Sequence, residues 1–258
     1  MDTVYISHGS PMLALDDCPA RDFLMNWREV LPEKPKAVLA ISAHWTTMEP
    51  SVSSSLYNST IHDFYGFPPA LYKLKYNAPG APDLAKRVKM LLRTAGFHLI
   101  QEDSSRGLDH GAWVPLILMY PEVDIPVCQL SVQPYRDAQH HYDLGRALAP
   151  LREEGILIMA SGSATHNLRT LDFGSNSPPS WAVAFDNWLN ECLMNGRFDD
   201  VIQYEKKAPH ATKAHPTPEH FLPLLVALGA AGDGAKARRI HTSWAGSTLS
   251  MASFVFTP

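Results

Sequence analysis

Short apolar runs rich in β-branched residues alternate along the chain with longer segments whose apolar residues recur three or four positions apart. The short runs have the length of buried strands and are bounded by turn residues: Val4–Ser7, Ala37–Ser42, Val127–Ser131 and Ile156–Ala160. The longer segments have the period of amphipathic helices and cover Ala20–Val30, Pro82–Ala95, Ala138–Glu153 and Ser180–Asn195. A further helix is predicted over Thr217–Leu228, with Thr217 as its cap and Pro218 in its first turn.

This alternation of strands and helices predicts an α/β fold with a mostly parallel central sheet flanked by helices on both faces. The 258 residues suit a single domain spanning 1–258, because no internal repeat, low-complexity tract or convincing linker divides the chain. In sheets of this kind the functional groups gather just beyond the carboxyl ends of the strands. We therefore expect the chemistry at that edge of the sheet.

The charge balance argues against nucleic acid as a partner. The 22 Lys and Arg residues and 26 Asp and Glu residues give a net charge of −4, without the basic face that phosphate binding needs. No membrane partner is expected, because the chain has no stretch of about 18 apolar residues and no leader-like start. Cys18, Cys128 and Cys192 are far apart and odd in number, which indicates free thiols in a reducing compartment. The expected location is cytoplasmic.

Histidine is the unusual component, since the chain has 12 and several follow predicted strands. His8, His44 and His166 come after three separate strands, and the topology would bring these strand ends together. His110 lies just before an apolar helical run, and His220 lies on the last predicted helix. Neutral imidazole is a good ligand for iron, zinc and copper, so the pattern predicts a metal site. The alternative is a set of unconnected histidines that cap helices or support loops.

Other chemistries fit the sequence less well. The chain has no HExxH or paired CxxC metal motif, no G-x-S-x-G nucleophile elbow, and no GxGxxG or phosphate-binding loop. Acidic residues near the histidines, Asp63, Asp109 and Glu219, are candidates for orienting imidazoles. Glu219 is also a candidate ligand, although on a helix it would project about 100° away from His220.

Several long motifs resemble one known family: SHGSPM, ISAHW, TIHDFYGFP, YNAPGAPDLAKRV, GLDHGAWVPLILMYPEVDIPVCQLSVQ, GSATHNLR and AHPTPEHFLPL. They resemble the class III extradiol ring-cleaving dioxygenases, and within them the plant-type branch of the 4,5-DOPA extradiol dioxygenases. The resemblance covers almost the whole chain. It implies an enzyme that uses dioxygen to open a catechol ring.

The resemblance also implies roles for the histidines. His8, His44 and His220 would hold the metal, and His166 would lie beside it as catalytic acid/base or as a fourth ligand in a resting zinc form. His110 would be a second catalytic histidine, near bound oxygen. Ring-opening dioxygenases usually present two histidines and one carboxylate, so either the ligands here are three histidines or Glu219 takes the place of His220. Fe(II) would be the working metal, and Zn(II) would be an inactive substitute in purified protein.

The partners implied by the resemblance are a small catechol and O2. DOPA cleaved at its 4,5 bond would give 4,5-seco-DOPA, the precursor of betalamic acid. One alternative is the same ring cleavage on another catechol, such as a caffeate-like phenylpropanoid. The other is a catalytically silent metal-binding protein with the same fold. Candidate substrate-binding residues are Arg169, whose fork suits a carboxylate, and His62, Asp63 and Tyr65 in the pocket wall. The sequence leaves open whether the protein is a monomer or a dimer.

Overall fold

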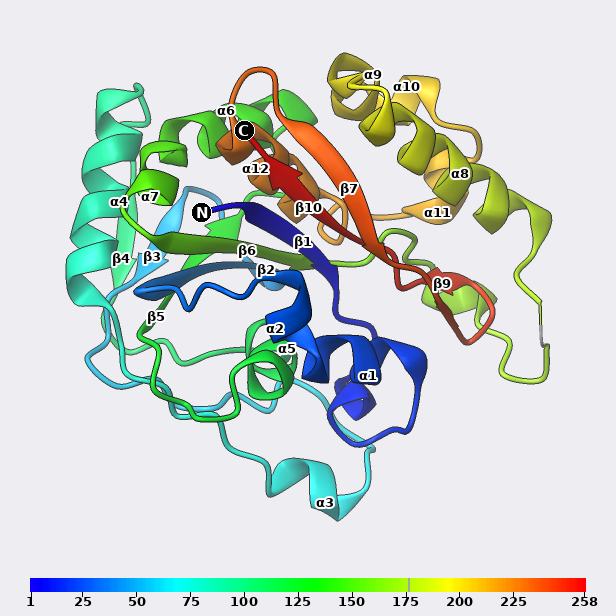
Figure 1. The fold of residues 1–258 in the computed structure, drawn as a ribbon, viewed down its shortest axis with the longest axis horizontal. Coiled ribbons are helices and arrows are strands. Elements are labelled where there is room, and N and C mark those ends of the chain that lie inside the picture. The colour runs from blue at the N-terminus through cyan, green and yellow to red at the C-terminus, as the bar shows by residue number, and fades with distance from the viewer. Residues whose placement is uncertain (176) are drawn as a thin grey trace.

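The computed structural model describes residues 1–175 and 177–258. An eight-stranded sheet crosses the middle of the molecule in the order β4-β3-β5-β2-β6-β1-β10-β7 (Figure 1). Its strands are β1 Thr3–Ser7, β2 Ala37–Thr46, β3 Ser51–Ser53, β4 Gln101–Asp103, β5 Val127–Val132, β6 Ile156–Gly162, β7 Lys236–His241 and β10 Ser253–Thr257.

The centre of this sheet is parallel. β5, β2, β6 and β1 pair in parallel, with Ala37 opposite Ile156 and Thr3 opposite Ile158. Antiparallel pairs occur toward the two sides, where β10 joins β1 to β7 and β3 pairs with β5. All residues of β1, β5 and β6 are buried, as expected for strands covered on both faces. The prediction of an α/β fold with a mostly parallel central sheet is confirmed.

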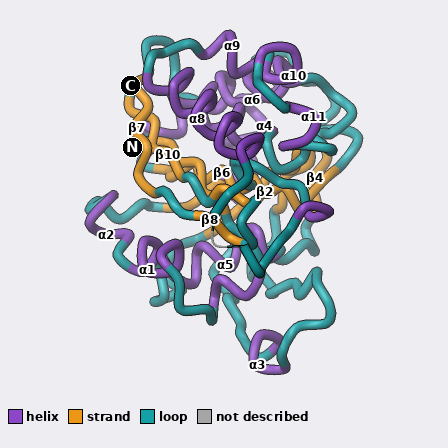
Figure 2. Tube along the Cα trace, turned by 90° about the vertical axis from the view of Figure 1, so that its right-hand side faces the viewer, coloured by secondary structure: helices purple, strands orange, loops and turns teal. Residues whose placement is uncertain are grey.

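Helices cover both faces of the sheet (Figures 1 and 2). One apolar layer packs Tyr5 and Leu39 of the sheet against α4 Pro82–Thr94, α6 Ala138–Leu148, α8 Ser180–Met194 and α12 Leu222–Ala231. The other layer packs Val4 and Val38 against α1 Pro19–Met25, α2 Trp27–Val30 and α5 His110–Met119. Neighbouring residues of one strand therefore enter opposite layers, which follows from the two-residue period of a strand.

Two predicted helices are each divided in the structure. The segment predicted as Ala20–Val30 forms α1 and α2, because Asn26 at φ −94° and ψ 24° interrupts the helical backbone. The segment predicted as Ala138–Glu153 forms α6 and α7 Pro150–Glu153, because Pro150 has no backbone N–H with which to continue the first helix.

The predicted helix over Thr217–Leu228 is wrong at its start. α12 begins only at Leu222, and Thr217 Oγ1 donates a hydrogen bond to Glu219 Oε1 at 2.9 Å instead of capping a helix. Pro216 and Pro218 favour a turn here, since proline restricts the residue before it and lacks an N–H. His220 therefore lies in the turn that leads into α12.

The remaining elements are short: η1 Pro11–Ala14, α3 Pro69–Tyr72, η2 Leu168–Thr170, α9 Phe198–Ile202, α10 Tyr204–Lys207, α11 Ala211–Ala214, β8 Trp244–Ala245 and β9 Leu249–Ser250. Cys18, Cys128 and Cys192 are free thiols, as predicted. Within residues 1–175 and 177–258, no helix has the length and apolar character needed to cross a membrane.

Candidate metal centre

Two of the predicted metal ligands lie at the carboxyl ends of parallel strands. His8 follows β1 directly, and its backbone N–H donates to Gly162 O at 3.0 Å, which continues the pairing of β1 with β6. β2 extends beyond its predicted end at Ser42, so His44 lies within this strand. The pairing of β2 with β5 changes register between Ile41 and Thr46, an irregularity of the kind that re-aims side chains near active sites.

Three imidazole nitrogens converge at this edge. His44 Nε2 lies 3.0 Å from His8 Nε2 and 3.3 Å from His220 Nε2. The ligand atoms of the three residues all lie within 4.8 Å of one another. Two nitrogens held about 2.1 Å from one ion, at angles between 90° and 110°, lie about 3.0 to 3.4 Å apart. The spacing in the structure therefore fits ligands of a single metal ion.

The tautomer of His8 follows from its neighbours. Its Nδ1 lies 2.9 Å from Ser161 Oγ, and the single hydroxyl hydrogen of Ser161 is donated to Gly111 O. Ser161 Oγ must therefore accept a hydrogen bond from His8 Nδ1–H. The hydrogen of the neutral ring is then on Nδ1, and Nε2 carries a lone pair toward His44.

The tautomer of His220 is fixed in the same way, by a carboxylate. Its Nδ1 lies 3.1 Å from Glu219 Oε1, which is an acceptor when ionised. The hydrogen of His220 is then on Nδ1, and its Nε2 also presents a lone pair. The Nε2 lone pairs of His8 and His220 are both directed toward His44, and a shared cation would satisfy them, so these residues fit a bound metal.

Burial keeps the three rings neutral, which metal binding requires. Burial, reinforced by the neighbouring histidines, lowers the pKa of His8 and of His220 well below the ordinary value of 6.5. Burial and the nearby His110 lower the pKa of His44 to about 4, against the opposing effect of Asp109 and Asp63.

His166 lies directly against one of these three residues. Its ring stacks on that of His220 with centroids 3.4 Å apart and planes 7° apart. Two backbone hydrogen bonds fix this contact, from His166 N–H to Ala214 O at 2.8 Å and from Ser163 N–H to His220 O at 3.0 Å. Burial lowers the pKa of His166 to about 4, although Glu219 opposes the shift. His166 is therefore a neutral ring beside the three imidazoles.

His110, the first residue of α5, brings a fifth imidazole to the site. Its ring centroid lies 3.9 Å from that of His44. Asp63 Oδ1 accepts the backbone N–H of His110 at 3.0 Å, and it also lies 3.0 Å from His110 Nδ1. Burial alone would raise the pKa of Asp63, but the contacts of its carboxylate with the ring and the backbone N–H of His110 outweigh burial and lower this pKa.

Asp109 supports the end of β2, the strand that carries His44. This buried carboxylate accepts hydrogen bonds from Ser42 Oγ at 2.6 Å and Gln129 Nε2 at 2.9 Å, and it pairs with Arg106 Nη2 at 3.1 Å. Ser42 Oγ in turn accepts the backbone N–H of His44 at 3.1 Å. Asp109 therefore holds the backbone of the β2 end, and it does not contact an imidazole ring by hydrogen bonding in the described structure.

The four predicted substrate-binding residues lie in different surroundings. Asp63 reaches the histidine cluster, as described above. His62 Nε2 lies 3.1 Å from Leu74 O and its ring packs among Phe64, Tyr72 and Trp113, so its visible contacts are those of loop packing. Tyr65 is 92% exposed, and Arg169 is exposed in η2. The structure brings only Asp63 into contact with the five histidines.

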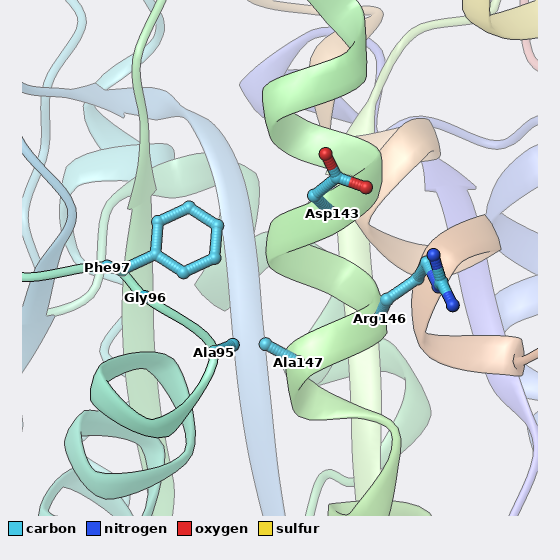
Figure 3. A pocket seen from close by; sticks show the side chains of 6 residues that line it. All are labelled: Ala95, Gly96, Phe97, Asp143, Arg146 and Ala147. Carbon is cyan, nitrogen blue, oxygen red and sulfur yellow. The ribbon is translucent and has the colours of Figure 1, made fainter.

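Sequence reasoning missed Ser161, which sets the tautomer of His8. A serine within a buried strand is more often a small core residue, and the S-G-S run at the end of β6 does not separate the two roles. A hollow lies elsewhere, on the helical layer between the end of α4 and α6 (Figure 3). Its volume is about 460 Å³ and none of the five histidines lines it; the lining residues are Ala95, Gly96, Phe97, Asp143, Arg146 and Ala147.

Neutral imidazoles that converge at the carboxyl edge of a parallel sheet are typical of the metal site of an α/β metalloenzyme. Residues 2–257 match the family model described as the catalytic LigB subunit of aromatic ring-opening dioxygenase. The chain therefore belongs to this family, and it is an extradiol ring-cleaving dioxygenase that depends on a metal and on O2.

Several relatives match over most of their length. The chain is 56% identical to the 4,5-DOPA dioxygenase extradiol of Beta vulgaris, over 99% of this chain and 96% of that protein. It is 42% identical to a protein of the same name from Escherichia coli K12, over 89% of this chain and 85% of that protein. The crystal structure of uncharacterized protein JW3007 from Escherichia coli K12 has a TM-score of 0.84 and 33% identity, and the match covers 100% of both chains.

Replacing Ser161 by alanine should weaken metal binding about 10- to 100-fold, because His8 Nδ1 loses the acceptor that fixes its tautomer. Competition with a chelator measures the affinity. Ser131→Ala is the matched control, since Ser131 is also buried in a strand but bonds to Ser51 and Thr47 away from the histidines. An unchanged affinity in a folded Ser161→Ala protein would contradict the assignment.

The metal-free protein should lose stability as the pH falls from about 6.5 to about 4. Burial in the folded protein lowers several histidine pKa values from 6.5 to about 4: those of His44 and His166 at the site, and those of the buried His141 and His215. Between these values the unfolded chain binds more protons, so stability is fully present above pH 6.5 and is lost through this window. Each extra proton lowers the free energy of unfolding by about 1.4 kcal/mol per pH unit. Urea unfolding of chelator-treated protein at stepped pH measures the slope, and a flat profile would be the contrary result.

Proposed function

We propose that this protein is a non-haem Fe(II) enzyme that cleaves DOPA at its 4,5 bond to give 4,5-seco-DOPA, the precursor of betalamic acid. The observation that carries the proposal is the convergence of His8, His44 and His220 through their Nε2 atoms. The substrate is argued from similarity, since relatives from Beta vulgaris, Portulaca grandiflora and Mirabilis jalapa carry the name 4,5-DOPA dioxygenase extradiol.

The metal would be held by His8, His44 and His220. Bound Fe(II) would supply the electron transfer between catechol and dioxygen that imidazoles cannot perform, whereas Zn(II), which has no redox chemistry, would leave the enzyme inactive. His220 is preferred to Glu219 as third ligand, because Glu219 Oε1 is already engaged by His220 Nδ1 and Thr217 Oγ1. Glu219 then orients a ligand and does not replace it.

His166 and His110 would act on protons beside that metal. His166 is neutral and stacked on His220, so one of its ring nitrogens can accept the proton of a catechol hydroxyl. In a resting zinc form the same ring would become a fourth ligand; the closeness of possible ligand atoms in His166, Glu219 and His220 supports this proposal. His110 would place its Nε2 near the reacting oxygen atoms.

The remaining assignments are extensions of this proposal. Residues 1–258 would form one catalytic domain, since the family match spans residues 2–257. Arg169, His62 and Tyr65 stay predictions for contacts with the substrate, and a cytoplasmic location stays a prediction as well. The partners are a small catechol and O2.

Protein loaded anaerobically with Fe(II) should consume O2 on addition of DOPA and form a yellow ring-opened product. The measurement is O2 uptake with product absorbance across DOPA, caffeate and protocatechuate at equal concentrations. DOPA should give the highest kcat/KM. A higher value for caffeate would assign the same chemistry to a phenylpropanoid, and turnover without O2 would identify a hydrolase.

The catalytic role of His166 is tested in the same assay. His166→Ala should retain iron but lose turnover by about 10²- to 10⁴-fold, the usual contribution of a positioned acid/base group. His98→Ala, which changes an exposed histidine, should leave both iron content and turnover unchanged. Full activity in His166→Ala would remove this residue from the mechanism.

A further inference from the structure

Asp63 was expected in the wall of the substrate pocket, but its contacts point to another task. We infer that Asp63 is a positioning residue: it holds the ring of His110 with Nδ1 toward the carboxylate, so that Nε2 faces the reacting molecules. The inference rests on the proposed function of His110 as a catalytic histidine. It concerns the reaction step and not the binding of the catechol.

The backbone around Asp63 is firmly held against the segment that carries His110. Ile61 N–H donates to Leu108 O at 2.8 Å, and Leu108 N–H donates to Ser59 O at 2.8 Å. Trp113, in the first turn of α5, donates its indole N–H to Ile61 O at 3.0 Å. These hydrogen bonds attach the 59–61 segment to the residues around the start of α5. The position of Asp63 relative to His110 is therefore fixed by the backbone.

The carboxylate of Asp63 makes two contacts with the same histidine. Its Oδ1 accepts the backbone N–H of His110 at 3.0 Å, at the N-terminal end of α5 where a negative charge is favourable. The same Oδ1 lies 3.0 Å from His110 Nδ1. The ring contact is a close charge contact and not an aligned hydrogen bond, because Nδ1 has no hydrogen-bond partner of acceptable angle.

The other neighbours of His110 cannot take over this task. The ring lies beside His44, with centroids 3.9 Å apart, and His8, with centroids 5.4 Å apart, and Phe64 packs edge-on at 5.8 Å. The two histidines already turn their Nε2 atoms toward each other, and Phe64 has no acceptor. Among the residues that the structure describes, Asp63 is thus the acceptor closest to His110 Nδ1.

The contact with Asp63 determines which ring nitrogen of His110 can face the reacting molecules with a lone pair. A carboxylate only accepts, so its contact with Nδ1 favours a hydrogen on that nitrogen, and a ring with one hydrogen then keeps its lone pair on Nε2. The side chain of Asp63 is 23% exposed, so it lies behind His110 without being sealed from solvent. Its Oδ2 lies 3.8 Å from His44 Nδ1, too far for a hydrogen bond, which leaves His110 as its main partner.

The kinetic test separates positioning from substrate binding. In Fe(II)-loaded protein, Asp63→Ala should lower kcat about 100-fold with a DOPA KM and an iron affinity within about twofold of the unchanged enzyme. Asp63→Asn keeps an oxygen acceptor and should lose about 10-fold. Asp17→Asn, at an exposed aspartate, is the matched control. A raised KM with unchanged kcat would contradict the inference and show that Asp63 binds the substrate. Loss of iron would also contradict it and show that Asp63 supports the proposed ligand His44.

A spectroscopic test does not depend on turnover. Long-range ¹H–¹⁵N correlation of the histidine rings, in protein loaded with diamagnetic Zn(II), reports which nitrogen of His110 carries hydrogen. We expect the Nδ1–H form in the unchanged protein and in Asp63→Asn, and a mixture in Asp63→Ala. Nε2–H in the unchanged protein would overturn the inference. If no catechol is cleaved while His110 shows Nδ1–H dependent on Asp63, the proposed function fails and the positioning contact stands.

Discussion

The structure depends on one electrostatic constraint: Nε2 of His44 lies within hydrogen-bond distance of Nε2 of both His8 and His220, two buried imidazoles. Ser161 and Glu219 hold the hydrogens of His8 and His220 on their outer nitrogens. The Nε2 lone pairs of His8 and His220 both face His44, and a shared cation would satisfy them. The family match explains the arrangement, because the members of this family require a metal for ring opening.

The parallel centre of the sheet brings these residues together. β1 lies beside β6 and β6 beside β2, so the ends of three strands meet at one edge. His220 comes from outside the sheet and needs separate support. Tyr5 O–H donates to His220 O at 3.0 Å, and Ser163 N–H donates to the same carbonyl at 3.0 Å. The turn before α12 is thereby fixed to β1 and to the end of β6.

The central strands of the sheet and the histidines that follow them could be predicted from the sequence. The strands that carry the site are apolar and buried on both faces, and a histidine after such a strand has its position set by topology. The antiparallel strand β7, KARRIH, could not be predicted, because it is polar and half-exposed and lacks the apolar pattern. The start of α12 was misplaced, since apolar spacing continues across the proline-rich turn.

The orienting residues were harder to predict, because their roles depend on contacts between distant segments. Ser161 meets His8 across 153 positions, and Asp63 meets His110 across 47. Nothing in the local pattern near Asp63 distinguishes a residue behind a histidine from one in a pocket wall. Only the pairing of the 59–61 segment with residue 108 decides where its carboxylate lies.

The most direct measurement is a crystal structure of the protein loaded with Fe(II) under anaerobic conditions, with the iron located by anomalous scattering. It should show one iron coordinated by Nε2 of His8, His44 and His220, with Glu219 bonded to His220 Nδ1. An iron ligated by the Glu219 carboxylate in place of His220, or bound away from these three residues, would contradict the account.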